Sequence, residues 1–130
     1  QSAIKTGLKV IFCIGETLNE KRNNKTNQVL SRQIKNGLKS IKNKSKIIIA
    51  YEPVWSIGTG LIPKIDDLIK SVSFIKSKFG KKTPKILYGG SVNSSNVDQL
   101  KKISIINGFL IGGASQNPKN FIDIIKKTYI

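Results

Sequence analysis

Short apolar runs alternate with longer amphipathic stretches along this chain. Four runs rich in Val, Ile, Leu, Phe and Tyr are predicted to be strands, at residues 9–14, 46–51, 85–88 and 108–111. After each of them apolar residues recur at helical spacing, which predicts helices around 29–41, 65–79, 96–102 and 118–129. Residues 1–7 are expected to be the tail of a further helix. This order of four strand-helix units predicts an α/β fold with a parallel sheet.

Candidate capping residues indicate where three of the predicted helices begin or end. Gly80 is expected to close the second helix in a C-cap position. Asn93 and Ser94 are candidate N-caps for the short third helix, and Asn117 with Pro118 is typical of an N-cap and first turn. The polar residues 19–27 are assigned no element.

The length of 130 residues is enough for one domain with a core. A hydrophobic content of 38% is typical of a globular chain, and no apolar run approaches the roughly 20 residues that span a bilayer. The start of the chain resembles no signal peptide, so we expect a cytoplasmic protein. The absence of His excludes catalysis or metal binding by imidazole from this chain.

The formal net charge is +16, from 23 basic and 7 acidic residues. Such a balance is compatible with nucleic-acid binding. Only Arg22 and Arg32 are arginines, however, and Arg is the residue suited to bidentate contacts with phosphates and bases. Because the lysines are spread along every predicted helix, we favour a solvated lysine surface over a nucleic-acid or other acidic partner.

The loops that follow the predicted strands carry the unusual residues. They are 15–16, 52–60, 89–92 and 112–115, whereas the loops that follow the helices are plain. In parallel α/β folds, ligands bind at the carboxyl ends of the strands. The order of the elements therefore predicts a site at this edge of the sheet.

Glu52 ends an apolar strand, where partial desolvation favours a carboxylate as a proton acceptor. The alternative is a strand-end Glu that faces water. Residues 53–60 then combine a rigid Pro53, apolar Trp55 and Ile57, and hinge glycines, which is typical of a mobile lid. An ordinary connection is the alternative, but those usually take about 2–6 residues.

Paired glycines follow both later strands, in the segments 88–92 and 112–115. Backbone N–H groups of glycines can approach an anion closely, so two such pairs resemble the phosphate site of many (β/α)8 barrels. Cys13 lies in an apolar strand without a histidine to activate it, so we expect a buried structural thiol. Glu16 is either a polar partner behind the site or a solvated loop residue.

Four segments together resemble one family. Ala50–Gly60 (AYEPVWSIGTG) is similar to the signature of the triosephosphate isomerases, and 12–17 (FCIGET), 86–92 (ILYGGSV) and 109–115 (FLIGGAS) match in the family's order. The resemblance covers residues 1–130 as the C-terminal half of a single TIM-barrel domain, with the fifth to eighth strand-helix units. It implies that the chain is a fragment of a longer protein.

The resemblance also implies the chemistry. Glu52 matches the base that moves a proton between two carbons of a phosphorylated triose, without metal or organic cofactor. The other matched residues are those of the phosphate site (Gly58, Ser91, Gly112, Gly113), those of the lid and its hinges (Pro53, Val54, Trp55, Ser56, Ile57, Thr59, Gly60), and those that set the lid's positions (Glu16, Tyr51, Tyr88). A homodimeric, cytoplasmic enzyme of glycolysis and gluconeogenesis, with no nucleic-acid or membrane partner, is implied for the complete protein.

The chain departs from the family in several places. The family's electrophilic His, its active-site Lys and its subunit-interlocking loop belong to the half that is absent, so the chain alone is expected to be inactive. Ser56 stands where the family usually has Ala, and Asn107 where Asp is common. Two other hypotheses remain, a phosphate-binding half-barrel from another (β/α)8 enzyme and a basic α/β module that binds nucleic acid. The first does not explain the lid, and the second lacks clustered arginines.

Overall fold

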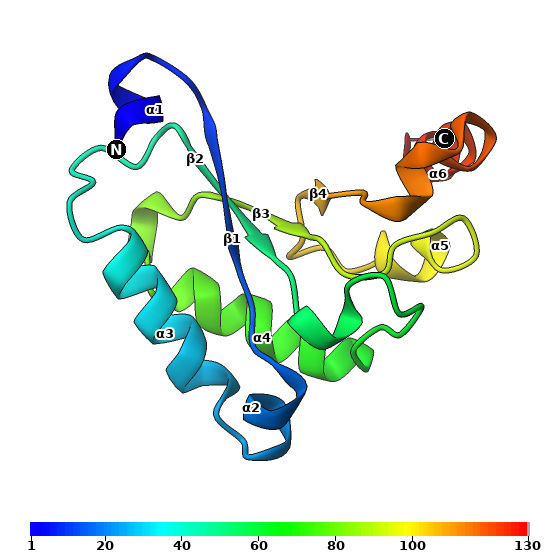
Figure 1. Cartoon of the computed structure of the whole chain (residues 1–130), viewed down its shortest axis with the longest axis horizontal. Helices are drawn as coiled ribbons and strands as arrows, with labels where there is room; N and C mark the ends of the chain where they lie inside the picture. The colour runs from blue at the N-terminus through cyan, green and yellow to red at the C-terminus, as the bar shows by residue number, and fades with distance from the viewer. Residues whose placement is uncertain (130) are drawn as a thin grey trace.

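The computed structural model describes residues 1–129 and contains one four-stranded sheet in the order β1-β2-β3-β4 (Figure 1). All neighbouring strands are parallel, which confirms the predicted α/β fold. The strands are β1 (Val10–Ile14), β2 (Ile47–Tyr51), β3 (Lys85–Tyr88) and β4 (Gly108–Phe109). Strand β4 is shorter than the apolar run 108–111 predicts, although Leu110 N–H beyond its end still donates to the Tyr88 carbonyl at 2.9 Å.

The helices of the described residues follow the strands as the periodicity predicts. The α-helices are α1 (Ser2–Lys5), α2 (Leu18–Arg22), α3 (Thr26–Gly37), α4 (Ile65–Ser77), α5 (Val97–Leu100) and α6 (Pro118–Tyr129), and the short 3₁₀ helices are η1 (Val54–Ser56), η2 (Gly80–Lys82) and η3 (Gly113–Gln116). Helix α2 lies within the polar stretch to which the sequence assigned no element. Its start is a capping box, in which Thr17 and Glu20 bond each other's backbone N–H groups.

One of the three capping predictions is confirmed. Asn117 accepts a hydrogen bond from the backbone N–H of Asn120 at 3.1 Å, as an N-cap does. Gly80 is not the C-cap of α4, because Lys78 takes that position and Gly80, with φ of 59°, opens η2. Neither Asn93 nor Ser94 is the N-cap of α5, since Asn96 takes that position.

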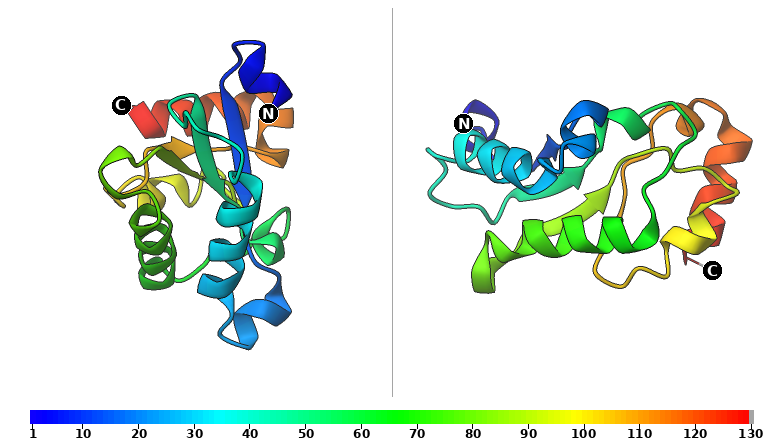
Figure 2. Two further views of the ribbon diagram at one scale, coloured as in Figure 1. Left: turned by 90° about the vertical axis from the view of Figure 1, so that its left-hand side faces the viewer. Right: turned by 90° about the horizontal axis from the view of Figure 1, so that it is seen from below.

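The core lies between the sheet and helices α3 and α4, which run side by side on one face (Figures 1 and 2). Strand register aligns the side chains that point into it. Ile49 pairs with Ile86 and Tyr51 with Tyr88, and all four are at most 2% exposed. Apolar burial of this kind supplies the main stabilisation of the unit.

The opposite face of the sheet is left partly open. Ile11 is 45% exposed, and Cys13, two residues along the same strand face, is exposed as well. The prediction that Cys13 is a buried thiol is therefore wrong. Because side chains alternate along a strand, Cys13 points away from α3 and α4.

The described residues contain neither a helix that could span a membrane nor a cluster of metal-binding side chains. Within residues 1–129, no helix combines the length and the apolar composition that are needed to cross a membrane. In the same part of the chain, no three His, Cys, Asp or Glu side chains are grouped so that they would hold a metal ion.

Candidate active site

The carboxyl ends of β1, β2 and β3 bring their loops to one edge of the sheet. The ladder continues past the strands, because Glu52 N–H donates to the Ile14 carbonyl at 2.8 Å and Gly89 N–H donates to the Tyr51 carbonyl at 2.9 Å. Backbone pairing therefore fixes Glu52 and Gly89 beside each other. This is the edge at which the sequence predicts a site.

Glu52 is half-buried, and its side chain lies on the open face of the sheet, against glycine backbone. A Cβ atom on Gly89 would lie 2.5 Å from Glu52 Cγ and 2.8 Å from its Oε1, so only glycine leaves room for the carboxylate in this position. A Cβ on Gly15 would collide with the Glu52 carbonyl oxygen. At both positions the backbone passes so close to Glu52 that only glycine, which has no Cβ atom, fits without a shift.

Cys13 is the nearest other titratable group on this face. Partial burial, followed by a hydrogen bond and charge repulsion from Glu52, raises the pKa of the Cys13 thiol to about 11. The thiol therefore stays protonated near neutral pH, and a nucleophilic role is disfavoured.

Residues 53–60 fold over this edge, anchored at both ends. Trp55 Nε1–H donates to Glu16 Oε1 at 3.1 Å. At the far end, Gly60 N–H donates to Ser91 Oγ at 2.9 Å. Gly58 and Gly60 have φ of 68° and 78°, a left-handed conformation that glycine adopts without strain. The segment is thus tied to two different strand-end loops.

Glu16 is a fully buried carboxylate behind the lid, which decides between the two alternatives for it in favour of a polar partner. It accepts hydrogen bonds from Trp55 and from Tyr51 Oη, the latter at 3.1 Å to Oε2. Burial, followed by the Glu16 charge, raises the pKa of the Tyr51 phenol. Burial also raises the pKa of Tyr88, with the hydrogen bond between Tyr88 and Ser56 acting the other way. Both tyrosines are therefore uncharged hydrogen-bonding groups.

Ser56 is the residue whose importance the sequence underestimated. It is fully buried, and its Oγ donates to the Leu61 carbonyl at 2.5 Å. The same oxygen lies 3.1 Å from Tyr88 Oη and accepts a long bond from Ser91 N–H at 3.3 Å. Alanine at this position has no hydroxyl, so none of these three hydrogen bonds could form. The other departure is milder, because Asn107 Oδ1 still accepts from Ile86 N–H at 2.8 Å.

A cavity of about 320 Å³ lies under the lid. It is lined by Glu52 and by all four residues predicted to bind phosphate, namely Gly58, Ser91, Gly112 and Gly113. Of the two apolar lid residues that the sequence singled out, Trp55 is half-buried and Ile57 is 50% exposed. Ile57 nevertheless contributes one wall of the cavity.

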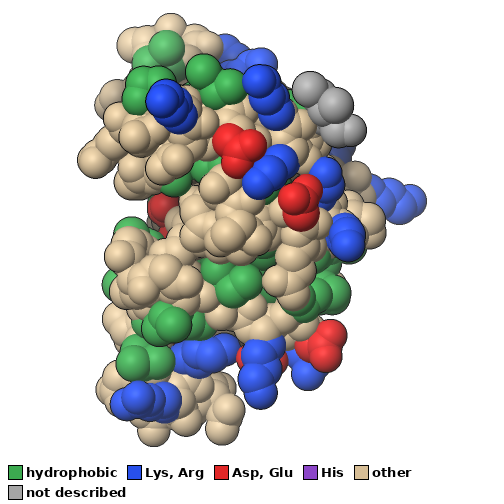
Figure 3. Space-filling view, turned by 90° about the vertical axis from the view of Figure 1, so that its right-hand side faces the viewer, with side chains coloured by type: hydrophobic (Ala, Val, Ile, Leu, Met, Phe, Trp, Pro, Cys, Tyr) green, Lys and Arg blue, Asp and Glu red, His purple; other side chains and the backbone are tan. Residues whose placement is uncertain are grey.

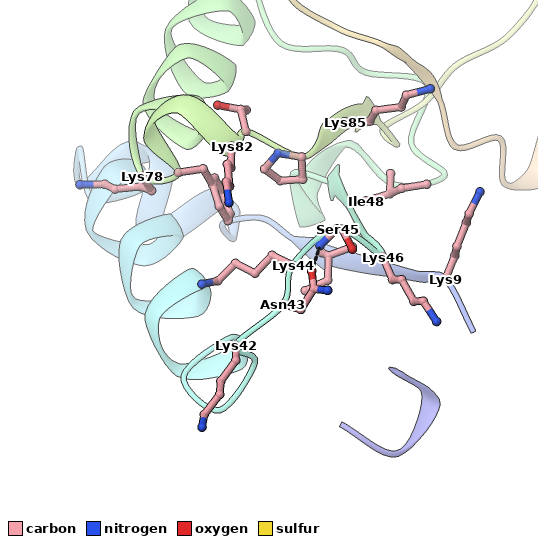
Figure 4. A pocket seen from close by; sticks show the side chains of 14 residues that line it. Lys9, Lys42, Asn43, Lys44, Ser45, Lys46, Ile48, Lys78, Lys82 and Lys85 are labelled. Atoms are coloured by element: carbon pink, nitrogen blue, oxygen red, sulfur yellow. Dashed lines mark hydrogen bonds between the residues drawn. The ribbon is translucent and has the colours of Figure 1, made fainter. Parts of the chain in front are cut away.

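A second and larger cavity, of about 970 Å³, opens at the other end of the strands (Figure 4). Its residues are not among those that the sequence singled out. We call it the basic cavity, because half of its lining residues are lysines, namely Lys9, Lys42, Lys44, Lys46, Lys78, Lys82 and Lys85. No acidic residue lines it.

Comparison with known proteins agrees with the geometry. The family model described as triosephosphate isomerase matches residues 1–128. Proteins named triosephosphate isomerase are 44% identical over 131 residues in Thermodesulfovibrio yellowstonii, 45% over 124 in Mycoplasma mobile and 45% over 130 in Saccharomyces cerevisiae. These alignments cover 95–96% of this chain and 51–53% of each relative, so the chain spans about half the length of the curated relatives that it matches.

Two independent features therefore point the same way, a cavity that joins one carboxylate to two glycine-rich loops and a sequence match that extends over almost every residue. The parallel α/β sheet also fits half of the barrel for which the family is known. The chain belongs to the triosephosphate isomerase family.

Proposed function

We propose that residues 1–130 form the C-terminal half of a triosephosphate isomerase, which interconverts dihydroxyacetone phosphate and D-glyceraldehyde 3-phosphate. One observation carries the proposal. Glu52, Gly58, Ser91, Gly112 and Gly113 line a single cavity, although they come from three loops that lie far apart in the sequence. A base beside an anion-binding surface is what proton abstraction from a small phosphate ester requires.

In this proposal the Glu52 carboxylate takes a proton from one carbon of the triose and returns it to the neighbouring carbon. The electron pair left behind forms an enediolate, and the negative charge develops on the carbonyl oxygen. A donor for that oxygen is needed, and within residues 1–129 no histidine exists to supply it. We assign that donor, with the active-site lysine, to the half of the protein that the chain does not contain.

The substrate phosphate is proposed to lie against the backbone N–H groups of Gly58, Ser91, Gly112 and Gly113. Gly112 and Gly113 have open space where a Cβ would be, which supports close approach of an anion. Closure of residues 53–60 would exclude water, so that the enediolate is protonated by the protein and not by solvent. Glu16, Tyr51 and Tyr88 hold the closed lid through the hydrogen bonds described above.

The complete protein is proposed to be a cytoplasmic homodimer of glycolysis and gluconeogenesis that needs no metal or cofactor. This part of the proposal rests on the family alone. Its substrate is a small phosphorylated triose, and neither nucleic acid nor membrane is a proposed partner.

The test is Glu52→Gln in the complete protein, measured in a coupled assay of isomerase turnover. The amide keeps the size of the side chain but cannot accept the proton, so kcat should fall by about 10²–10⁴-fold. KM should change little, because the phosphate contacts are unaffected. Asp66→Asn is the control, since it removes an exposed carboxylate in the first turn of α4. Near-normal turnover of the Glu52 variant would refute the proposed base.

A further inference from the structure

The basic cavity lies at the end of the sheet opposite Glu52. Its walls are residues 42–48, between α3 and β2, and residues 78–85, between α4 and β3, with Lys9 at the start of β1 (Figure 4). The lysines are far apart in the sequence. Parallel strands bring them together, because every loop that leads from a helix into a strand ends at the same edge of the sheet.

The positive charge in this cavity is not neutralised within the described residues. The ion pairs among residues 1–129 are Lys21–Asp67, Arg32–Glu20, Lys101–Asp98 and Lys127–Asp123. None of them involves a lysine of the basic cavity. On the side of α5 and α6, by contrast, Lys and Arg side chains are interspersed with acidic ones (Figure 3). A concave surface of one sign concentrates its electrostatic potential. What distinguishes the basic cavity from the rest of the lysine-rich exterior is that seven lysines and no acidic residue surround one hollow, which favours binding of an anion.

Two of its lysines already have a partner. Lys46 Nζ donates to the Gly7 carbonyl at 3.1 Å, and Lys78 Nζ lies 4.3 Å from the centre of the Phe74 ring. Lys44 and Lys82 differ from them, because neither side chain has a hydrogen bond or ion pair among residues 1–129. Figure 4 shows their side chains projecting from the two opposing loops into the gap between them.

The shape and the residue types restrict the anion. A volume of about 970 Å³ is at the upper end of the range for small-molecule sites. No arginine lines the cavity, so two-point contacts with carboxylates, phosphates or bases are not available there. Ammonium groups act as compact point charges, which suit the tetrahedral phosphate group.

We propose that the basic cavity binds a small molecule that carries several phosphate groups, held between Lys44 and Lys82. This site lies apart from the proposed isomerase site and does not depend on it. Two lysines from two separate loops suit a ligand that carries more than one phosphate group.

The test is calorimetric titration of the complete protein with inorganic tripolyphosphate at moderate salt. Lys44→Gln with Lys82→Gln should weaken binding by at least about tenfold, because each charge-assisted hydrogen bond contributes roughly that factor. The matched control is Lys35→Gln with Lys70→Gln, two exposed lysines on α3 and α4 outside the cavity. Both double substitutions remove the same charge. A difference in affinity between them therefore indicates a local site and not an effect of net charge. Lys44→Arg with Lys82→Arg should restore most of the affinity.

Three results would overturn the proposal. The first is no binding of tripolyphosphate to the unsubstituted protein at about 1 mM. The second is equal weakening by the two glutamine pairs, which would mean that net charge alone attracts the anion. The third is tighter binding of a hexaglutamate peptide or a short single-stranded RNA than of tripolyphosphate, with the same dependence on Lys44 and Lys82. Isomerase turnover of the glutamine pair should equal that of its control, which keeps this test separate from that of Glu52.

Discussion

At the scale of single residues, Ser56 and Gly89 hold the proposed base and its lid in position. Ser56 does so by hydrogen bonding, since its buried hydroxyl joins Leu61, Tyr88 and Ser91. Gly89 does so by having no side chain where the Glu52 carboxylate lies. The sequence motif includes both residues, but it does not indicate what either of them contacts.

Ser56→Ala is expected to destabilise the complete protein by roughly 1–3 kcal/mol, because the Tyr88 hydroxyl loses a partner in a buried site. The measurement is the free energy of unfolding in urea. Ser73→Ala, on the exposed side of α4, is the control. If both variants were equally stable, the hydroxyl would have no role in holding the loop.

Gly89→Ala is expected to lower kcat by up to about 10²-fold, the effect of displacing a catalytic group by about 1 Å. Its backbone is not in the left-handed region, so the added methyl group meets chiefly the flexible Glu52 side chain. The melting temperature should therefore change little while turnover falls. A normal kcat would show that Glu52 does not need the position that it has here.

At the scale of elements, hydrogen bonds fix the lid at both ends. Trp55 Nε1–H and Val54 N–H donate to Glu16, and Gly60 N–H donates to Ser91 Oγ. Ser91 Oγ also donates to the Ser56 carbonyl at 2.5 Å. One side chain on the β3–α5 loop thus secures both the middle and the end of residues 53–60. Ser91 thus holds residues 53–60 in this arrangement through two hydrogen bonds, whereas the Ile57 side chain in the same segment is 50% exposed.

Ser91→Ala should favour the open lid in the complete protein. We expect a raised KM and a faster rate of lid opening, measured by relaxation dispersion or by the fluorescence of Trp55, the chain's single tryptophan. The backbone N–H of residue 91 is retained, so the substitution separates the side-chain hydrogen bonds from the proposed phosphate contact. Unchanged lid kinetics would contradict this role for Ser91.

The sequence predicts most of these elements because strands and amphipathic helices carry strong periodic patterns. It also predicts that Glu52 and the paired glycines lie together at one edge of the sheet, because they occur directly at strand ends. Helix α2 was missed although Thr17 and Glu20 form a readable capping box. The exposure of Cys13 was missed for a different reason. The alternation of side chains along a strand shows on which face of the sheet a residue lies. It does not show whether another element covers that face.

The basic cavity could not be predicted from the spacing of the lysines along the chain. Its lysines occur in separate segments, so along the chain they resemble an evenly charged surface. Only the topology of a parallel sheet gathers Lys44 and Lys82 at one edge. Charge clusters of this kind become visible when the order of the strands is known.

At the scale of the whole molecule, the four-stranded sheet has two free edges, β1 and β4, and one partly open face. Four strands cannot close into an eight-stranded barrel, and unpaired strand edges favour association. We therefore expect the isolated chain to be loosely folded or self-associated. Light scattering and chemical unfolding would check this, and a monomer with sharp cooperative unfolding would count against it.

The most direct measurement of the central claim is isomerase turnover by two proteins, the 130-residue chain alone and the complete protein that contains it. The account predicts turnover by the complete protein, lost with Glu52→Gln, and none above background by the chain alone, because the electrophile for the developing oxyanion lies outside it. Turnover by the isolated chain, or a complete protein that does not interconvert the two triose phosphates, would contradict it.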